Sequence, residues 1–191
     1  DVGGLLPKAI AESENVFLFM PDYCTKSIKK LRAVSLENLT VSIGEKNFPA
    51  VIKKVTVSPN FSVFFVSNEH FFAREFLYGD SSGDYPDNFM RFLFFQLAAL
   101  EFICKNRLHF DIIHCNDWQT AMIPLLIKME SRSAFFNKTK TVFSIHNLGY
   151  QGIFAGDLFK DLALPAYLFS PEYLEFYGKL NCMKAGIIFS D

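Results

Sequence analysis

FDIIHCNDWQTAMIPLLIKME, residues 110–130, joins a short apolar run directly to a longer helical pattern. The run FDIIHC predicts a short buried strand. The residues after it predict a helix with one apolar face, formed by Trp118, Met122, Leu125 and Met129. Pro124 lies inside this helix and predicts a kink, because proline has no backbone N–H to donate. A strand that leads directly into a helix is typical of an α/β sheet.

The same alternation continues on both sides of this segment. Residues 15–23, NVFLFMPDY, and residues 140–147, KTVFSIHN, predict further strands. Residues 39–68 hold three β-rich runs separated by turn residues, which predicts an antiparallel meander. A long helix is expected next, with one core-facing stripe formed by Phe89, Phe92, Gln96, Leu100 and Ile103. Strands that alternate with long helices predict an α/β fold with a mostly parallel sheet and flanking helices.

The composition is that of a protein with a sizeable apolar core. Half of the 191 residues are apolar and 23 are phenylalanine. The formal net charge is −1, which argues against a nucleic-acid partner, because such partners are usually met by a basic excess. The most apolar segment, residues 89–104, is interrupted by Arg91, Gln96 and Glu101. We therefore expect a buried or amphipathic helix there, not a membrane span, and no membrane partner.

The four cysteines, Cys24, Cys104, Cys115 and Cys182, show no C-x-x-C spacing. This pattern predicts reduced, buried thiols in a cytoplasmic protein, and it does not favour a disulfide framework or a zinc site. The sequence also offers no clustered set of His, Cys and Asp ligands. We therefore expect neither a metal ion nor a cofactor.

Polar residues follow three of the predicted strands directly: Pro21-Asp22, Cys115-Asn116-Asp117 and His146-Asn147. Ligands of open α/β sheets bind outside the carboxyl ends of the strands. Asp117 has two compatible interpretations. Asn116 or Asp117 can cap the following helix, with Gln119 at capping-box spacing from Asn116. Alternatively, the Asp117 carboxylate accepts a hydrogen bond from a sugar hydroxyl.

His146 and Asn147 lie between an apolar strand and two glycines, Gly149 and Gly152. A single histidine is more often an ordinary surface or core residue than a catalytic one. Here the glycines favour the functional interpretation, because they let the backbone approach a ligand closely. A neutral imidazole and an amide each offer a donor and an acceptor, which suits uncharged hydroxyl groups.

Residues 77–88, LYGDSSGDYPDN, form a dense cluster of turn residues before the long helix. Such a loop is either a solvated connection or a functional segment. Tyr85, next to Pro86, offers an aromatic face for stacking on a sugar and a hydroxyl group. Asp87 or Asn88 is expected to cap the helix that follows.

Four segments resemble, in order, successive blocks of one family, the bacterial glycogen synthases and plant starch synthases. They are YGDSSGDYPDNFMRFLFF, DIIHCNDWQTAMIPLLIK, TVFSIHNLGYQGIF and LEFYGKLNCMKAGIIFSD, which begin at residues 78, 111, 141 and 174. The first ten residues, DVGGLLPKAI, are similar to the segment just after the family's Lys-x-Gly-Gly-Leu loop. One such block is weak support, whereas four in order are strong support.

The resemblance implies a retaining glucosyltransferase that moves glucose from ADP-glucose to the non-reducing end of an α-1,4-glucan. It implies the GT-B fold, in which two Rossmann-like domains enclose a cleft. Residues 1–191 would then be a single Rossmann-like N-terminal domain, truncated at both ends, without the nucleotide-binding second domain. We expect this chain alone to be inactive. Its own residues do not distinguish ADP-glucose from UDP-glucose.

The resemblance also implies roles for five residues of this chain. His146 would contact the transferred glucose and is the candidate catalytic residue. Asn147 and Asp117 would line the same sugar pocket, and Tyr85 would lie on the cleft wall. Asp1 matches the acidic residue after the glycine loop and is the fifth substrate-binding candidate.

Two other interpretations compete with this one. Another two-domain glycosyltransferase, such as a sucrose synthase relative, is less favoured because the four blocks are those of the synthases. A non-catalytic carbohydrate-binding or regulatory module would keep the sugar pocket without the transfer reaction.

Overall fold

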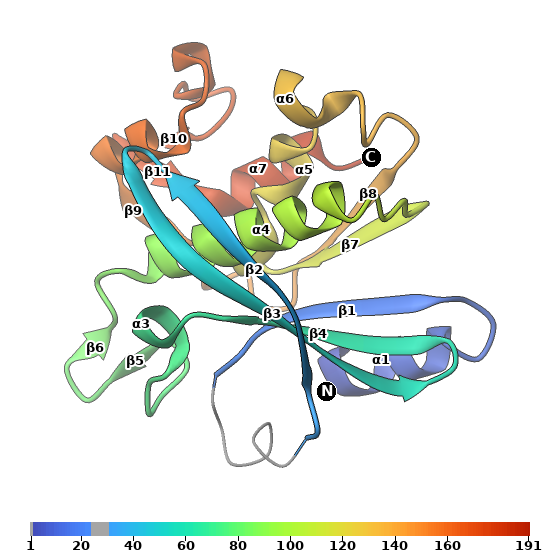
Figure 1. Ribbon diagram of the computed structural model, residues 1–191. Helices are drawn as coiled ribbons and strands as arrows, with labels where there is room; N and C mark the ends of the chain where they lie inside the picture. Colours follow the sequence, from blue (N-terminus) through green and yellow to red (C-terminus); the bar gives the residue numbers. More distant parts are fainter. Residues whose placement is uncertain (1, 24–30) are drawn as a thin grey trace. The chain divides into compact units, whose positions relative to one another are not determined.

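The computed structural model of the chain describes residues 2–23 and 31–191 (Figure 1). Its internal contacts gather into two units. Unit 1 runs to Val41 and continues over Phe48–Tyr85, and unit 2 holds Ser42–Asn47 and Pro86–Asp191. The expectation of one Rossmann-like domain over residues 1–191 stays a prediction.

Unit 1 contains a four-stranded sheet in the order β1-β4-β3-β2. Strand β1, Val16–Pro21, pairs in parallel with β4, Phe61–Ser67. Strand β3, Lys46–Ser58, pairs antiparallel with β4 and is joined to β2, Val34–Ile43, by a two-residue turn. The predicted antiparallel meander is confirmed. Its first strand begins five residues earlier than the predicted run at Leu39.

Strand β4 is the buried centre of this sheet. Six of its seven residues are buried, as its sequence FSVFFVS leads one to expect for a strand covered on both faces. Phe61, Val63 and Phe65 form an apolar cluster. Packed against this cluster are Ala11, just after helix α1 (Val2–Ile10), then Val16, Leu18 and Met20 of β1, and Val55 of β3.

The predicted exit of β1 at Pro21-Asp22 is confirmed, and its carboxylate faces the interior. Asp22 is 4% exposed. Its Oδ2 atom accepts a hydrogen bond from the Ser67 hydroxyl at 2.6 Å and forms an ion pair with the Lys53 ammonium at 2.8 Å. These contacts join β1, β4 and β3 at one end of the sheet.

Two short elements complete unit 1. Helix α3, Glu69–Phe72, is capped by Asn68, whose side chain accepts from the Phe71 N–H. Within the predicted 77–88 loop, strands β5, Gly79–Asp80, and β6, Gly83–Asp84, pair as a small hairpin. The loop is therefore partly ordered by its own backbone pairing.

Helix α4, Asn88–Lys105, is the long helix of unit 2. All five residues of its predicted core stripe are buried, which confirms the helical period. Asp87 precedes the helix at the cap position, but its side chain makes no capping hydrogen bond. Asn88 instead accepts a hydrogen bond from Arg91 Nη1 at 2.7 Å.

Strands β7, Ile112–Asn116, and β8, Lys140–Ser144, form a parallel pair with Asn116 opposite Ser144. The prediction of a strand here is confirmed, but the expectation that β7 is buried is wrong. Only Cys115 is buried, and Ile112 is 61% exposed. The reason is the strand's alternation, which turns Cys115 inward and its neighbours to the opposite face.

The single kinked helix predicted over residues 116–130 is also wrong. The segment breaks into a 3₁₀ turn η1, Trp118–Thr120, and two one-turn helices, α5, Ile123–Leu126, and α6, Glu130–Ser133. Pro124 lies in the first turn of α5, where its missing N–H costs nothing. Proline therefore starts a new helix here instead of kinking a continuous one.

The C-terminal third of unit 2 is made of short elements around a small antiparallel sheet. Strands β10, Glu175–Phe176, β11, Lys179–Asn181, and β9, Ile153–Ala155, lie side by side in that order. Two 3₁₀ segments, η2 (Gly156–Leu162) and η3 (Ala166–Leu168), connect them.

Helix α7, Cys182–Phe189, follows β11 and packs on β8. Gly186 permits this packing: a Cβ there would lie 2.6 Å from the Phe143 ring. After the helix, the Asp191 carboxylate accepts from the Thr141 backbone N–H at 2.9 Å and the Lys140 ammonium at 3.0 Å. These hydrogen bonds hold the pKa of Asp191 well below its usual value.

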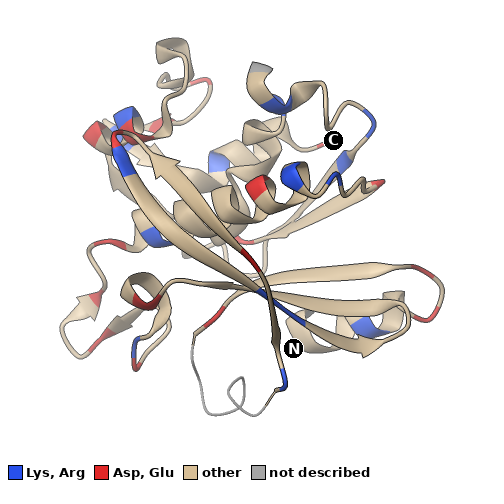
Figure 2. Ribbon diagram, viewed as in Figure 1, with Lys and Arg blue, Asp and Glu red and all other residues tan. Residues whose placement is uncertain are grey.

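Charged residues of both signs are scattered over the elements instead of gathering on one of them (Figure 2). Among the residues that the structure describes, no helix is both long and apolar enough to span a membrane.

Candidate functional site

The carboxyl ends of β7 and β8 bring together five predicted or neighbouring polar residues within unit 2. The parallel register places Asn116 beside Ser144. Asp117 follows β7 directly, and His146 and Asn147 lie two and three residues beyond β8. Two strand exits that lie 30 residues apart in the sequence therefore form one cluster.

Asp117 holds this cluster together. Its Oδ1 atom accepts hydrogen bonds from the backbone N–H groups of His146, at 2.7 Å, and Asn147, at 3.2 Å. Its own N–H donates to the Ser144 carbonyl at 2.9 Å. We call this set of three hydrogen bonds the Asp117 clasp.

The backbone of Asp117 is strained. Its φ of 56° and ψ of 179° fall in a region that residues other than glycine rarely occupy. Such a conformation costs on the order of 1–3 kcal/mol and persists only where the surroundings hold it. The clasp provides that support. Strain of this kind gathers at functional sites, so it favours a functional interpretation of this exit.

The predicted helix-capping role of Asn116 and Asp117 is wrong. Asp117 precedes η1, but its side chain makes no capping bond. The Thr120 hydroxyl instead donates to the Asn116 carbonyl at 2.8 Å. The side chains of Asn116 and Asp117 instead bind His146, which follows β8. The helix they were expected to cap is only one short 3₁₀ turn.

Two histidines on the exposed face of the pair are each bonded across the strands. Nε2 of His146 lies 2.9 Å from Oδ1 of Asn116, and Nε2 of His114 lies 2.7 Å from Oγ of Ser144. The pKa of His114 lies below its ordinary value, first because of partial desolvation and second because a charge on His146 repels its own. The arrangement therefore favours neutral imidazole at His114.

Asn147 begins a tight turn. Its Oδ1 atom accepts a hydrogen bond from the Gly149 N–H at 3.0 Å, and its carbonyl accepts from the Tyr150 N–H at 3.2 Å. Because the side-chain oxygen is used within the turn, the N–H₂ group is what Asn147 can offer to a ligand. The side chain then acts as a donor.

Next to Asp117 in the sequence, Trp118 packs its ring closely against the backbone of Gly152. Gly152 has a φ of +64°, and a Cβ there would lie 2.6 Å from the Trp118 ring. Only glycine fits both the conformation and the approach. Trp118 also packs edge to face on Phe92, with ring centroids 5.0 Å apart.

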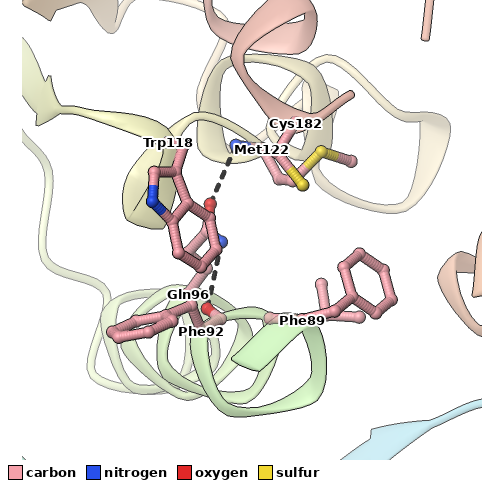
Figure 3. A pocket seen from close by; sticks show the side chains of 7 residues that line it. Phe89, Phe92, Gln96, Trp118, Met122 and Cys182 are labelled. Atoms are coloured by element: carbon pink, nitrogen blue, oxygen red, sulfur yellow. Dashed lines mark hydrogen bonds between the residues drawn. The ribbon is translucent and has the colours of Figure 1, made fainter. Parts of the chain in front are cut away.

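Gln96 fixes the segment after Asp117 from the α4 side (Figure 3). Its side-chain N–H₂ donates to the Phe92 carbonyl at 3.0 Å, and its oxygen accepts from the Met122 N–H at 2.9 Å. Figure 3 shows the Gln96 side chain between the Phe92 carbonyl and the Met122 N–H, with a dashed line for each of these two hydrogen bonds. Gln96 thus replaces a helical hydrogen bond at the start of α5.

Two predicted site residues are not placed in this cluster. Tyr85 belongs to unit 1, where the Arg74 guanidinium lies 4.7 Å from its ring centroid and occupies one face of the ring. Asp1 lies outside the described residues. The roles of both stay predictions.

The sequence interpretation missed three residues that shape the site: Asn116 as a partner of His146, His114, and Gln96. His114 and Asn116 are two residues apart on a strand, so strand alternation alone places them on one face. Gln96 lies in an otherwise apolar stripe of α4, where a buried polar side chain signals a specific hydrogen-bond partner.

The three cysteines outside residues 24–30 are thiols with raised pKa values, so they are poor nucleophiles. Cys104, Cys115 and Cys182 are free thiols, and burial raises the pKa of both Cys115 and Cys182 to about 12. Cys24 lies outside the described residues. Over residues 2–23 and 31–191, no group of three or more His, Cys, Asp or Glu side chains is arranged to hold a metal ion.

Comparison with known proteins gives one consistent result. The family model described as starch synthase catalytic domain matches residues 1–191. Glycogen synthase 2 of Geobacter sulfurreducens is 38% identical over 194 residues, and glycogen synthase of Pseudothermotoga lettingae is 41% identical over 203 residues. Both alignments cover 100% of this chain and 40% of the relative.

A solved structure agrees with these matches. The catalytic domain of starch synthase IV from Arabidopsis thaliana, bound to ADP and acarbose, superposes with a TM-score of 0.86 at 28% identity. The superposition covers 100% of this chain and 39% of the starch synthase IV chain. The predicted fold class, an α/β Rossmann-like fold of the GT-B type, is confirmed. The chain spans about 40% of the length of the curated relatives it matches.

Proposed function

We propose the function of this chain from one premise: it belongs to the starch synthase catalytic-domain family, whose model matches it from residue 1 to residue 191. The protein that contains it transfers glucose from ADP-glucose to the non-reducing end of an α-1,4-glucan, with retention of the anomeric configuration. This chain contributes the acceptor side and part of the pocket for the donor glucose.

The observation that carries the proposal is the Asp117 clasp. A strained, non-glycine residue at a strand exit is held by two backbone N–H groups from another strand exit. The clasp sets the position of His146 and Asn147 at the carboxyl ends of parallel strands, where α/β proteins bind ligands. A purely structural exit has no need of strain.

The chemistry of the cluster fits a neutral sugar. His146 and Asn147 are exposed and carry an imidazole and an amide, two groups that can each donate and accept hydrogen bonds. Asp117 uses Oδ1 within the clasp, which leaves Oδ2 to accept from a sugar hydroxyl. Bidentate and multiple hydrogen bonds to hydroxyl groups orient a sugar ring for attack at its anomeric carbon.

Glucosyl transfer also develops negative charge on the leaving diphosphate, which needs cationic groups or helix-terminal amides. The cluster has none of these among its members, so its task is to position the sugar. In this proposal His146 contacts the transferred glucose, and Asn147 and Asp117 line its pocket. Tyr85 lies on the wall of the cleft, and Asp1 is a further substrate-binding candidate because it matches the acidic residue after the family's glycine loop.

The ligands of the structural neighbour support the substrate classes. That protein was solved with ADP and acarbose, a nucleotide and a sugar-like molecule. Carried over to this chain, they correspond to a nucleotide-sugar donor and a glucan acceptor.

The test is glucose transfer by the full-length protein from ADP-glucose to glycogen, with the His146→Ala variant beside it. We expect transfer to fall by roughly 10²–10³-fold, the range for losing a group that acts on the transition state. His109→Ala is the matched control, because His109 is exposed and precedes β7, at the opposite end of the strand pair. It should retain full activity.

Three outcomes are informative. Transfer that survives His146→Ala removes this residue from its proposed role. No transfer by the folded full-length protein, with glycogen binding retained in affinity electrophoresis, identifies a non-catalytic carbohydrate-binding module instead. A strong preference for UDP-glucose overturns the proposed donor.

A further inference from the structure

We infer that Asn116 is a positioning residue for His146: its side-chain oxygen selects, in the neutral imidazole, the tautomer with the proton on Nε2, which leaves Nδ1 as a hydrogen-bond acceptor for the ligand. The part about the ligand rests on the function proposed above. The tautomer itself is a property of the protein and can be measured separately.

The first step is the contact itself. Oδ1 of Asn116 lies 2.9 Å from Nε2 of His146, a normal hydrogen-bond distance. An amide oxygen only accepts hydrogen bonds, so Nε2 must carry the proton. A neutral imidazole has one protonated nitrogen, and Nδ1 then keeps its lone pair.

The second step is that Asn116 is itself held in place. It is the last residue of β7 and pairs with Ser144 in the ladder. Its carbonyl accepts a hydrogen bond from the Thr120 hydroxyl at 2.8 Å. The residue that orients the imidazole therefore belongs to a regular element with a bonded backbone, which is what precise positioning requires.

The third step concerns the remaining freedom of His146. Its backbone N–H is bound to Asp117, and its Nε2 is bound to Asn116. Backbone and ring are thus anchored by two consecutive residues of the other strand exit. Nδ1 is the one ring nitrogen that these bonds leave for a ligand.

The fourth step concerns charge. Among the residues that the structure describes, His114 on β7 and Asp117 after it are the titratable groups in contact or electrostatic interaction with His146. His114 and His146 repel each other when both are protonated. Asp117 is bound to the backbone of His146 and not to its ring. The neighbouring Ser144 hydroxyl is bonded to His114, so it does not compete with Asn116 for the His146 ring.

The direct experiment is nitrogen NMR of the full-length protein labelled with ¹⁵N-histidine, with His146→Gln used to assign the signals. We expect the neutral His146 ring to show a protonated Nε2 and an unprotonated Nδ1. In Asn116→Ala the two tautomers should exchange and average. A spectrum with the proton on Nδ1 overturns the inference, because the Asn116 amide would then be turned the other way.

The second experiment compares pH profiles of glucose transfer. In Asn116→Asp a carboxylate beside the ring stabilises the imidazolium, which cannot accept at Nδ1. We expect transfer to fall at neutral pH and to recover as the pH rises. Asn116→Ala should lower kcat by about tenfold with little change in profile, the effect of losing one hydrogen bond in the transition state.

Asn137→Asp is the matched control for the added charge. Asn137 is exposed and precedes β8, at the end of the strand pair opposite to His146. The pH profile of Asn137→Asp should equal that of the unaltered protein. If the pH profile of Asn116→Asp also equals that of the unaltered protein, the positioning role of Asn116 is overturned. Absence of transfer in the unaltered protein contradicts the proposed function alone, since the NMR result still reports the tautomer.

Discussion

In each of two pairs of parallel strands, an aspartate directly follows one strand, and the two aspartates have opposite surroundings. Asp22, after β1, is buried and bound to Lys53 and Ser67. Asp117, after β7, sits on a strained backbone and is bound to two amides beside an exposed histidine. Position at a strand exit is therefore a weak guide to function.

The comparison teaches what separates the two roles. At Asp22 the contacts with Lys53 and Ser67 compensate the cost of burying a charge, so they account for the residue through stability. At Asp117 the fold maintains a conformation that costs energy and gains no burial from it. A side chain that is held in place on a strained backbone is therefore a better candidate for function than a buried side chain whose polar atoms are simply paired.

The largest expected effect breaks the comparison at Asp117. Asp117→Ala removes the acceptor that holds His146 and Asn147, and we expect transfer by the full-length protein to fall by about 10²-fold or more. The free energy of unfolding should change by only about 1 kcal/mol, because the lost hydrogen bonds are exposed and strain is partly released. Steady-state kinetics and urea unfolding measure the two quantities.

Asp117→Asn sharpens the same test. Asparagine keeps an oxygen that can accept from both amides and tolerates positive φ better than most residues. If the clasp is what matters, this variant should keep much of the activity that Asp117→Ala loses. Equal losses in both variants would assign the effect to the negative charge or to the second acceptor oxygen, Oδ2, and not to the clasp.

The next effect breaks the comparison at Asp22. Asp22→Asn leaves Lys53 without its ion-pair partner, and we expect the free energy of unfolding to fall by about 2 kcal/mol. This is less than for a fully buried pair, because the Lys53 side chain is 34% exposed. Once folded, the variant should keep normal kcat, the reverse of Asp117→Ala.

Asp84→Asn is the control for the change in charge, since Asp84 is exposed in the β5–β6 hairpin. It should shift stability by no more than about 0.5 kcal/mol. A loss of kcat in Asp22→Asn without loss of stability would show that Asp22 is functional after all, and the distinction between the two exits would fail.

The same contrast shows how far sequence carries. The buried stripe of α4 followed from its hydrophobic period, because the period reports directly which side chains face a core. The meander around β3 followed from β-rich runs and the turn residues between them. The prediction of one helix after β7 was wrong because a proline such as Pro124 can either kink a helix or begin a new one. Here the backbone N–H of Met122, just before α5, is bound by the Gln96 side chain, 26 residues away, which suits a helix that begins at this point.

The site divides in a similar way. Asp117, His146 and Asn147 could be proposed from polar residues at strand exits and from the family resemblance. The pairing of Asn116 with His146 could not, because it depends on the register of β7 on β8. A shift of that register by one residue would turn Asn116 to the other face. The strain at Asp117 likewise leaves no mark in a single sequence.

The smallest expected effect concerns the inward face of the same strand exit. Cys115 lies between His114 and Asn116 but points into the core, and burial raises its pKa from 9.0 to about 12, as it does for Cys182. A thiol that holds its proton more tightly when folded contributes stability that is complete below pH 9. That contribution is lost as the pH rises from 9 toward 12.

Between pH 8 and pH 10 the free energy of unfolding should therefore fall by about 1 kcal/mol for each buried thiol. Cys182→Ala should lose less on the same pH step than the unaltered protein, whatever its stability at pH 8. The half-buried Cys104, replaced in the same way, should change the step less. If Cys182→Ala leaves the pH step unchanged, the folded protein does not hold the Cys182 proton more tightly than the unfolded chain does, and the expected effect of burial is contradicted.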